Sequence, residues 1–140
     1  MEYVVLAAWI VQAGVGVALF VGWLRHGRGS HAPTVLTHVG LSLAGLGLWV
    51  WFVLGGGLWP AWLALVAITA GNVLGDAMMV RRSRRATGVT TTFWKGYGAA
   101  IGQVFRGVMP PHVTFHALFA GVVYFTCLGV CIGATVAATG

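Results

Sequence analysis

Four long apolar stretches, separated by short polar or glycine-rich segments, dominate the pattern of the chain. They cover about residues 3–24, 34–54, 60–80 and 112–138. Each is close to the length of about 20 residues that a helix needs to cross the hydrocarbon of a bilayer. Each is also apolar on all faces, without the alternation of a membrane β-strand. The pattern predicts an all-α integral membrane protein whose residues 1–140 form one membrane domain with four transmembrane helices.

Proline and glycine mark the ends of these stretches. Pro33 stands just before the second stretch, where the first turn of a helix tolerates a missing N–H. Residues 55–57 are three glycines and separate the second stretch from the third by a short turn, so these two helices are expected to be antiparallel neighbours. The simplest architecture is an up-down four-helix bundle, in which the first and third spans are diagonal and the second and fourth are diagonal.

The segment before the fourth stretch has a different pattern. Between about residues 91 and 108, apolar residues recur at helical spacing and polar residues fall between them. This pattern predicts an amphipathic helix that lies in the cytoplasmic interface of the membrane, between spans three and four. Such a helix either covers the bundle or offers a docking surface to a partner subunit.

Composition supports a membrane location, and the placement of charge adds an orientation. Only 7% of the residues are charged, against about a quarter in soluble domains, which argues against a soluble enzyme or a nucleic-acid-binding domain. All eight basic residues fall after the first stretch or after the third: Arg25, Arg28, Arg81, Arg82, Arg84, Arg85, Lys95 and Arg106. Basic residues beside spans favour the cytoplasmic side. We therefore expect both termini to be external, in what is expected to be a prokaryotic plasma membrane.

Three ionisable side chains lie inside the predicted spans at one depth. His38, Asp76 and His116 each stand about four residues from the cytoplasmic end of a different span, or roughly 6 Å at a rise of about 1.5 Å per residue. Ionisable groups within a bilayer are costly and usually mark a functional site. This layer is the main candidate site of the chain.

Haem b is one cofactor that such a layer can bind. Low-spin electron-transfer haem takes two axial imidazoles, and His38 and His116 lie on diagonal spans in the expected bundle. Glycines leave room for the porphyrin: Gly71 and Gly75 on the third span, and Gly14, Gly16 and Gly22 on the first. Basic residues at the boundary are available for the haem propionates: Arg25, Arg81 and Arg82.

The placement of His38 and His116 among glycines resembles that in small transmembrane b-type cytochromes, which hold haem between histidines of different helices in a four-helix bundle. The resemblance implies an accessory or haem-binding electron-transfer subunit of a membrane complex, with these two histidines as axial ligands. The chain departs from many such cytochromes in two respects. It has one matched histidine pair instead of two, and it places Asp76 near the expected haem face.

Three further interpretations remain open. A transition-metal site would take nitrogen and oxygen ligands from His38, His112, His116 and Asp76. A structural subunit or anchor of a larger assembly would use Asp76 to pair with a histidine or with Arg81. A small transporter would use Asp76 and Asn72. The expected partners are the lipid bilayer and other membrane subunits or further copies of the chain, and no residue is assigned a catalytic role.

Overall fold

The computed structural model describes residues 1–26, 31–88 and 92–140, and these residues form five α-helices. The helices are α1 (Glu2–His26), α2 (Ala32–Val53), α3 (Leu58–Thr87), α4 (Phe93–Phe105) and α5 (Pro111–Thr139). All of them except α4 are long and apolar enough to cross a membrane. The predicted all-helical chain with four candidate spans is confirmed. Arg28 and the first residue of the expected amphipathic segment, Thr91, lie outside the described residues.

The largest difference from the predicted boundaries is the end of α3. The third span was expected to end at Val80, but α3 continues to Thr87, because no proline or glycine interrupts the chain before Gly88. Gly88 then adopts a left-handed conformation (φ 67°), and its N–H donates to the carbonyl of Arg84, as is usual at a helix end. The basic residues that follow the third span therefore lie on further turns of the same helix.

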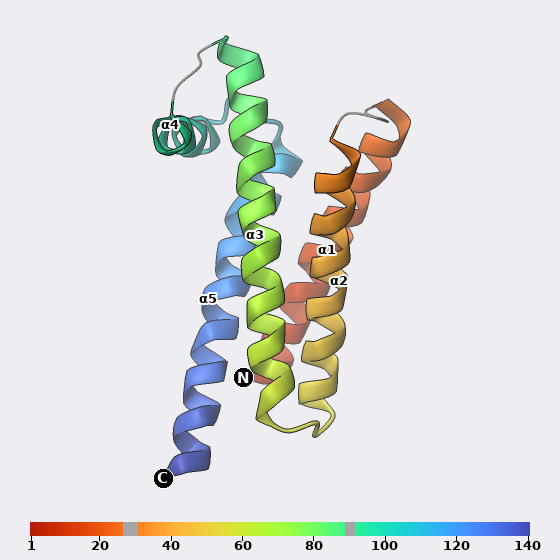
Figure 1. Ribbon diagram of the computed structural model, residues 1–140, viewed down its shortest axis with the longest axis vertical. Helices are drawn as coiled ribbons and strands as arrows, with labels where there is room; N and C mark the ends of the chain where they lie inside the picture. Colours follow the sequence, from red (N-terminus) through yellow and green to blue (C-terminus); the bar gives the residue numbers. More distant parts are fainter. Residues whose placement is uncertain (27–30, 89–91) are drawn as a thin grey trace.

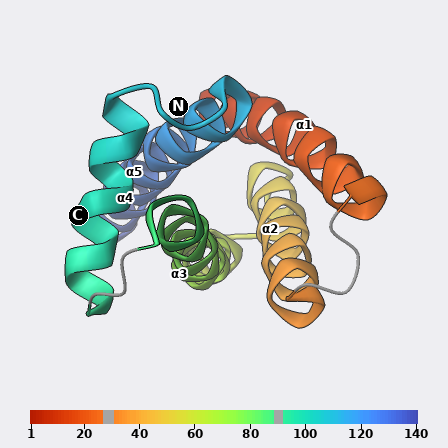
Figure 2. The same cartoon turned by 90° about the horizontal axis from the view of Figure 1, so that it is seen from above.

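The four long helices surround a common axis in chain order (Figures 1 and 2). Contacts join α1 to α2, α2 to α3, α3 to α5 and α5 to α1, so that α2 and α5 are diagonal. Successive long helices run in opposite directions in the ribbon. The short helix α4 packs on α3 and lies across the bundle near the end of α3 that carries the arginines.

One half of the bundle is tightly packed. Its buried cluster comprises Val5, Trp9, Trp49, Ala61, Ala64, Leu65, Ile68, Val123, Cys127 and Cys131. Trp9 fits against Gly45 so closely that a Cβ atom there would approach the indole Cζ2 to 2.9 Å. Close approach of small and large residues is how helices associate in lipid, where apolar burial alone gives little. We call this end, near the turn between α2 and α3, the closed half.

The other half of the bundle has far fewer buried residues, and we call it the open half. It comprises residues 13–26 of α1, 32–44 of α2, 72–78 of α3 and 111–122 of α5, and none of these described residues is fully buried. Beyond it a second, small apolar cluster joins α3 and α4 to the start of α5: Met79, Val80, Ala100, Val104 and Met109. The open half is thus a layer between two apolar clusters.

Candidate functional site

Two of the three predicted intramembrane groups, His38 of α2 and His116 of α5, meet across the open half. Their ring centroids lie 6.3 Å apart, and the ring planes make an angle of 71°. Both side chains are half-buried. Diagonal helices therefore bring two imidazoles into one place, as the depth of these residues in the sequence suggested.

A backbone carbonyl fixes the orientation of the His38 ring. Its Nδ1 lies 2.8 Å from the carbonyl oxygen of Gly71 on α3. A carbonyl only accepts hydrogen bonds, so Nδ1 carries the hydrogen and the lone pair of the neutral ring is on Nε2. Histidines that ligate metals commonly donate their other ring N–H to a carbonyl in this way. Nε2 of His38 is therefore available as a ligand atom.

The second imidazole, His116, is held through its backbone instead of its ring. Nε2 of Gln12 donates to the main-chain oxygen of His116 at 2.8 Å and so joins α1 to α5. Nδ1 of His116 and Oε1 of Gln12 are both buried, and neither has a hydrogen-bond partner among the described residues. Buried polar atoms without partners are uncommon and costly. These two atoms could therefore bond to a further group beside the histidine pair.

Each imidazole rests against a glycine of the neighbouring helix. A Cβ atom at Gly75 would lie 3.3 Å from Cε1 of His38, and a Cβ atom at Gly16 would lie 3.3 Å from Cε1 of His116. Both distances are tighter than ordinary van der Waals contact, so any larger residue would displace the ring. The two sides of the site are built alike, with a histidine on one helix and a glycine on the next.

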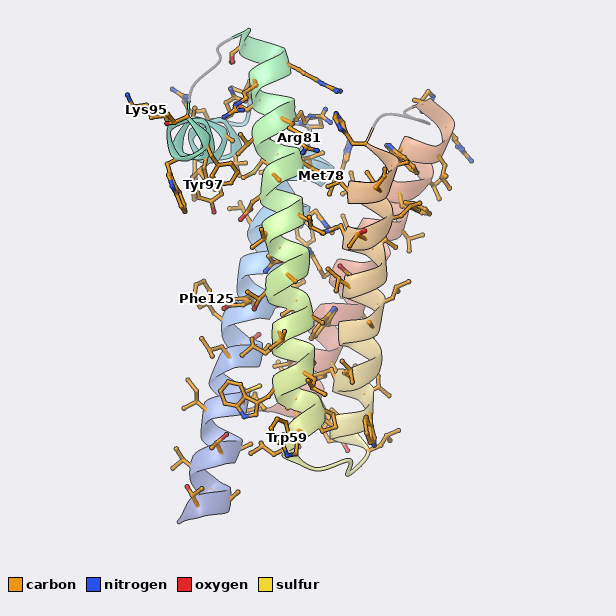
Figure 3. The ribbon with its side chains drawn as sticks, in the orientation of Figure 1. Trp59, Met78, Arg81, Lys95, Tyr97 and Phe125 are labelled. Carbon is orange, nitrogen blue, oxygen red and sulfur yellow. The ribbon has the colours of Figure 1, made fainter. Side chains whose placement is uncertain are left out.

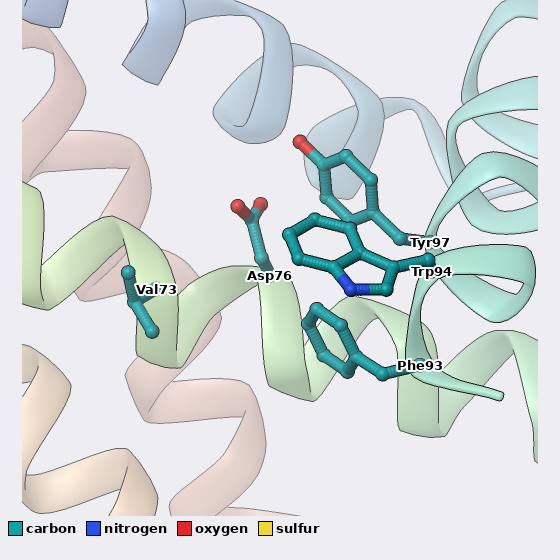
Figure 4. Close-up of a pocket in the computed structure, with 5 residues that line it drawn as sticks. All are labelled: Val73, Asp76, Phe93, Trp94 and Tyr97. Atoms are coloured by element: carbon teal, nitrogen blue, oxygen red, sulfur yellow. The ribbon is translucent and has the colours of Figure 1, made fainter.

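The third intramembrane group, Asp76, faces α4 and belongs to a separate cavity (Figure 4). The phenol of Tyr97 lies beside its carboxylate and interacts with it electrostatically. These two residues, together with Val73, Phe93 and Trp94, line a cavity of about 250 Å³. Burial raises the pKa of Tyr97, and the nearby carboxylate raises it further. Tyr97 therefore keeps its proton at neutral pH and remains a donor.

The remaining predicted residues stand apart from the histidine pair. His112 is exposed in the first turn of α5, Arg25 is exposed in the last turn of α1, and Arg81 and Arg82 are exposed on α3 more than a turn before its end. Nη1 of Arg81 lies 3.5 Å from the hydroxyl of Thr34 on α2. Within residues 1–26, 31–88 and 92–140, no three His, Cys, Asp or Glu side chains are grouped so that they could hold a metal ion.

The site offers two candidate protein ligands, the imidazoles of His38 and His116, and this number limits which metal ions or cofactors it can bind. A structural or catalytic zinc site takes three or four protein ligands, whereas haem brings its own four nitrogens and needs only the axial pair. The two ring centroids lie 6.3 Å apart, and a pair of imidazoles suits haem better than zinc. His38 and His116 are the residues that would hold the group.

Two features of the site were not predicted from the sequence. The partner of Asp76 is Tyr97, which the helical spacing of residues 93–108 placed on an apolar face without indicating a partner. The identity of the partner of Gln12, the main-chain oxygen of His116, was not predicted either. A glutamine in the middle of an apolar span indicates only that it needs a polar partner, such as a backbone carbonyl.

Comparison with known proteins adds no assignment to this geometry, because no protein-family model, curated protein or solved structure matches the chain.

Proposed function

We propose that the chain is a membrane protein that binds haem b and transfers electrons, with His38 and His116 as its axial ligands. The observation that carries this proposal is the pair of imidazoles 6.3 Å apart on diagonal helices. The hydrogen bond that orients the His38 ring and the scarcity of buried side chains in the open half support it. When bound, haem supplies a one-electron redox couple.

The chain contributes orientation, space and charge to this function. The Gly71 carbonyl presets the His38 ring, which raises the basicity of its free nitrogen. Gly16 and Gly75 keep the helix backbones close to the two rings. The exposed arginines of α1 and α3, Arg25, Arg81 and Arg82, offer positive charge for the propionates.

The same proposal includes an orientation in the membrane. We propose that α1, α2, α3 and α5 cross the bilayer in up-down order and that α4 lies in the cytoplasmic interface. The described basic residues support this orientation, because they lie at the end of the bundle that carries α4, where Figure 3 labels Arg81 and Lys95. Both termini are then external. Cysteine-accessibility labelling of Gly140→Cys and Lys95→Cys variants tests this, because both residues are exposed and only the former should react from outside intact cells.

An absorption spectrum tests the haem proposal directly. The full chain is purified in detergent from haem-replete cells, and spectra are recorded before and after reduction with dithionite. A Soret band with sharp α and β bands on reduction is the expected result. His38→Ala and His116→Ala should each remove these bands while leaving insertion and helix content unchanged, because each removes one axial ligand.

Two other histidines serve as matched controls. His26 lies at the end of α1, and its Nδ1–H donates to the Gly22 carbonyl at 3.2 Å, so His26→Ala should keep the full spectrum. His112→Ala should also keep it, because His112 is exposed. A colourless wild-type protein, or full colour in both His38→Ala and His116→Ala, contradicts the proposal. Loss of the haem bands in His112→Ala alone would contradict the assignment of His38 and His116 and would make His112 the ligand to test.

A further inference from the structure

The carboxylate of Asp76 has no charged partner among the described residues. Its one described side-chain partner is Tyr97, a neutral phenol. The ion pair found in the described part of the chain joins the amino terminus to Glu2, far from this cavity. A half-buried carboxylate without a counter-ion is costly, and in a membrane protein such a group usually serves a ligand or a pathway.

No basic side chain lines this cavity among the described residues. Arg81 reaches Thr34 on α2, and Nη2 of Arg85 donates to Nε2 of His31 at 2.8 Å. Arg84 packs against Gly96 of α4, and Lys95 projects from α4 away from the bundle (Figure 3). The described lining thus holds one carboxylate and no cation, in a chain of net charge +6.

Aromatic rings form the rest of the cavity wall. The rings of Phe93 and Tyr97 lie nearly parallel, at 16° and with centroids 6.3 Å apart. Trp94 stands across Phe93 at 79° with a centroid distance of 5.5 Å, and 78% of its surface is exposed. The faces of aromatic rings attract cations, and rings set at different angles around a carboxylate make a cage for an ammonium group.

We propose that this cavity, which lies between α3 and α4 and is separate from the histidine pair, binds an organic ammonium cation. Asp76 supplies the counter-charge, and Trp94, Phe93 and Tyr97 supply the cage. A volume of about 250 Å³ suits one small head group better than a drug-sized ligand, for which about 300–1,000 Å³ is usual. Two sources share this chemistry: a soluble amine such as choline, and the ammonium head group of a phospholipid.

Binding of choline to the full chain tests the proposal. The chain is placed in nanodiscs of phosphatidylglycerol, which has no ammonium group, and choline binding is followed by saturation-transfer NMR. The neutral isostere 3,3-dimethylbutan-1-ol has the same shape without the charge. We expect saturable choline binding and at least about ten-fold weaker binding of the isostere, because both the carboxylate and the ring faces act on charge.

Variants separate the roles of the wall. Asp76→Asn should abolish choline binding, and Trp94→Ala should weaken it by about ten-fold. Tyr97→Phe keeps the ring and should leave the affinity within about three-fold, whereas Tyr97→Ala should not. Trp59→Ala is the matched control, because Trp59 is also 78% exposed but lies at the opposite end of the bundle, where it should not change binding.

The outcomes are distinct. Equal binding of choline and its isostere, or unchanged binding in Asp76→Asn, overturns the proposal and points to a site for neutral apolar molecules. Competition by phosphatidylethanolamine added to the nanodiscs supports it and identifies a lipid head group as the source. Choline binding that this lipid leaves unchanged supports it with a soluble ligand. None of these results depends on haem, so the two proposals fail independently.

Discussion

The two halves of this bundle are made of the same kind of helix but are packed by different means. In the closed half, Trp9 and Trp49 are 2% and 0% exposed, and Gly45 gives the first of them room. In the open half the residues that face one another are His38 and His116, and the neighbouring polar atoms of His116 and Gln12 are left without partners. The closed half is densely packed, whereas the open half is sparsely packed and adjoins buried polar atoms that have no described partners.

This difference separates the half in which packing stabilises the chain from the half that holds the proposed haem ligands. Dense packing of small against large side chains is the main source of helix association in lipid, and only the closed half has it. Unsatisfied buried atoms and sparse packing lower local stability, which is typical of ligand-binding regions. We therefore expect substitutions in the closed half to change the free energy of unfolding, and substitutions in the open half to change ligand binding.

The largest expected effect is that of Trp9→Ala in the closed half. Removing a buried tryptophan leaves a cavity and should lower the free energy of unfolding by about 3–5 kcal/mol. Steric trapping or unfolding in denaturing detergent measures this change. Trp51→Ala is the control, because Trp51 is 57% exposed and its loss should cost much less. Equal losses for the two variants would show that burial of Trp9 adds nothing to stability beyond what an exposed tryptophan contributes.

Gly45→Ala should have the next largest effect, by overpacking instead of by a cavity. The new Cβ atom would lie 2.9 Å from Cζ2 of Trp9 and 3.4 Å from the carbonyl oxygen of Ala64. Forcing an extra methyl group into such a contact costs about 1–3 kcal/mol. Gly47, on the same helix, has nothing within 4 Å of the corresponding position, so Gly47→Ala should be neutral. If haem is bound, its spectrum should be unchanged in folded Gly45→Ala.

The contrast between the halves was only partly readable from the sequence. The four candidate spans could be predicted because the length of apolar sequence needed to cross a bilayer is a strong constraint. The depth of a residue in the membrane could be predicted by counting residues from the end of its span, and this placed His38 and His116 at one level. The rotation of each helix about its axis could not be predicted, because packing between helices sets it.

Asp76 shows what rotation changes. It directly follows Gly75, which adjoins His38, but one residue turns a helix by about 100°. Asp76 therefore faces α4 and lies beside the phenol of Tyr97. That partner depends on how α4 docks on α3, through tertiary contacts such as that of Val80 with Gly96, which no spacing rule within one segment reveals.

In the open half, Gly75→Ala and Gly16→Ala should act unequally on haem retention. Each new Cβ atom would lie 3.3 Å from an imidazole Cε1, so each ring must shift. The His38 ring is tied to the Gly71 carbonyl and can shift only by straining its rotamer or that bond, which costs about 0.5–1.5 kcal/mol or roughly two- to ten-fold in affinity. The His116 ring has no such tie, and Gly16→Ala should have a smaller effect.

Haem titration of the purified apoproteins measures both variants of this pair. Gly14 lies on α1, like Gly16, and has nothing within 4 Å of its Cβ position. If haem is bound, the Gly14→Ala variant should therefore bind it as the wild type does. The free energy of unfolding of the apoproteins should change little in all three variants. A larger effect of Gly16→Ala than of Gly75→Ala would contradict the assignment of His38 as the fixed ligand.

The smallest expected effect belongs to a polar link between α1 and α5, the bond from Gln12 to the His116 carbonyl at 2.8 Å. Interhelical hydrogen bonds in membranes contribute about 0.6 kcal/mol on average. Gln12→Leu removes this bond but also removes the Oε1 atom that is buried without a described partner, and the second change offsets the first. The free energy of unfolding should therefore change by no more than about 0.6 kcal/mol. A loss above about 2 kcal/mol, measured as for Trp9→Ala, would exceed what one such bond contributes and would mean that Gln12 holds the open half together.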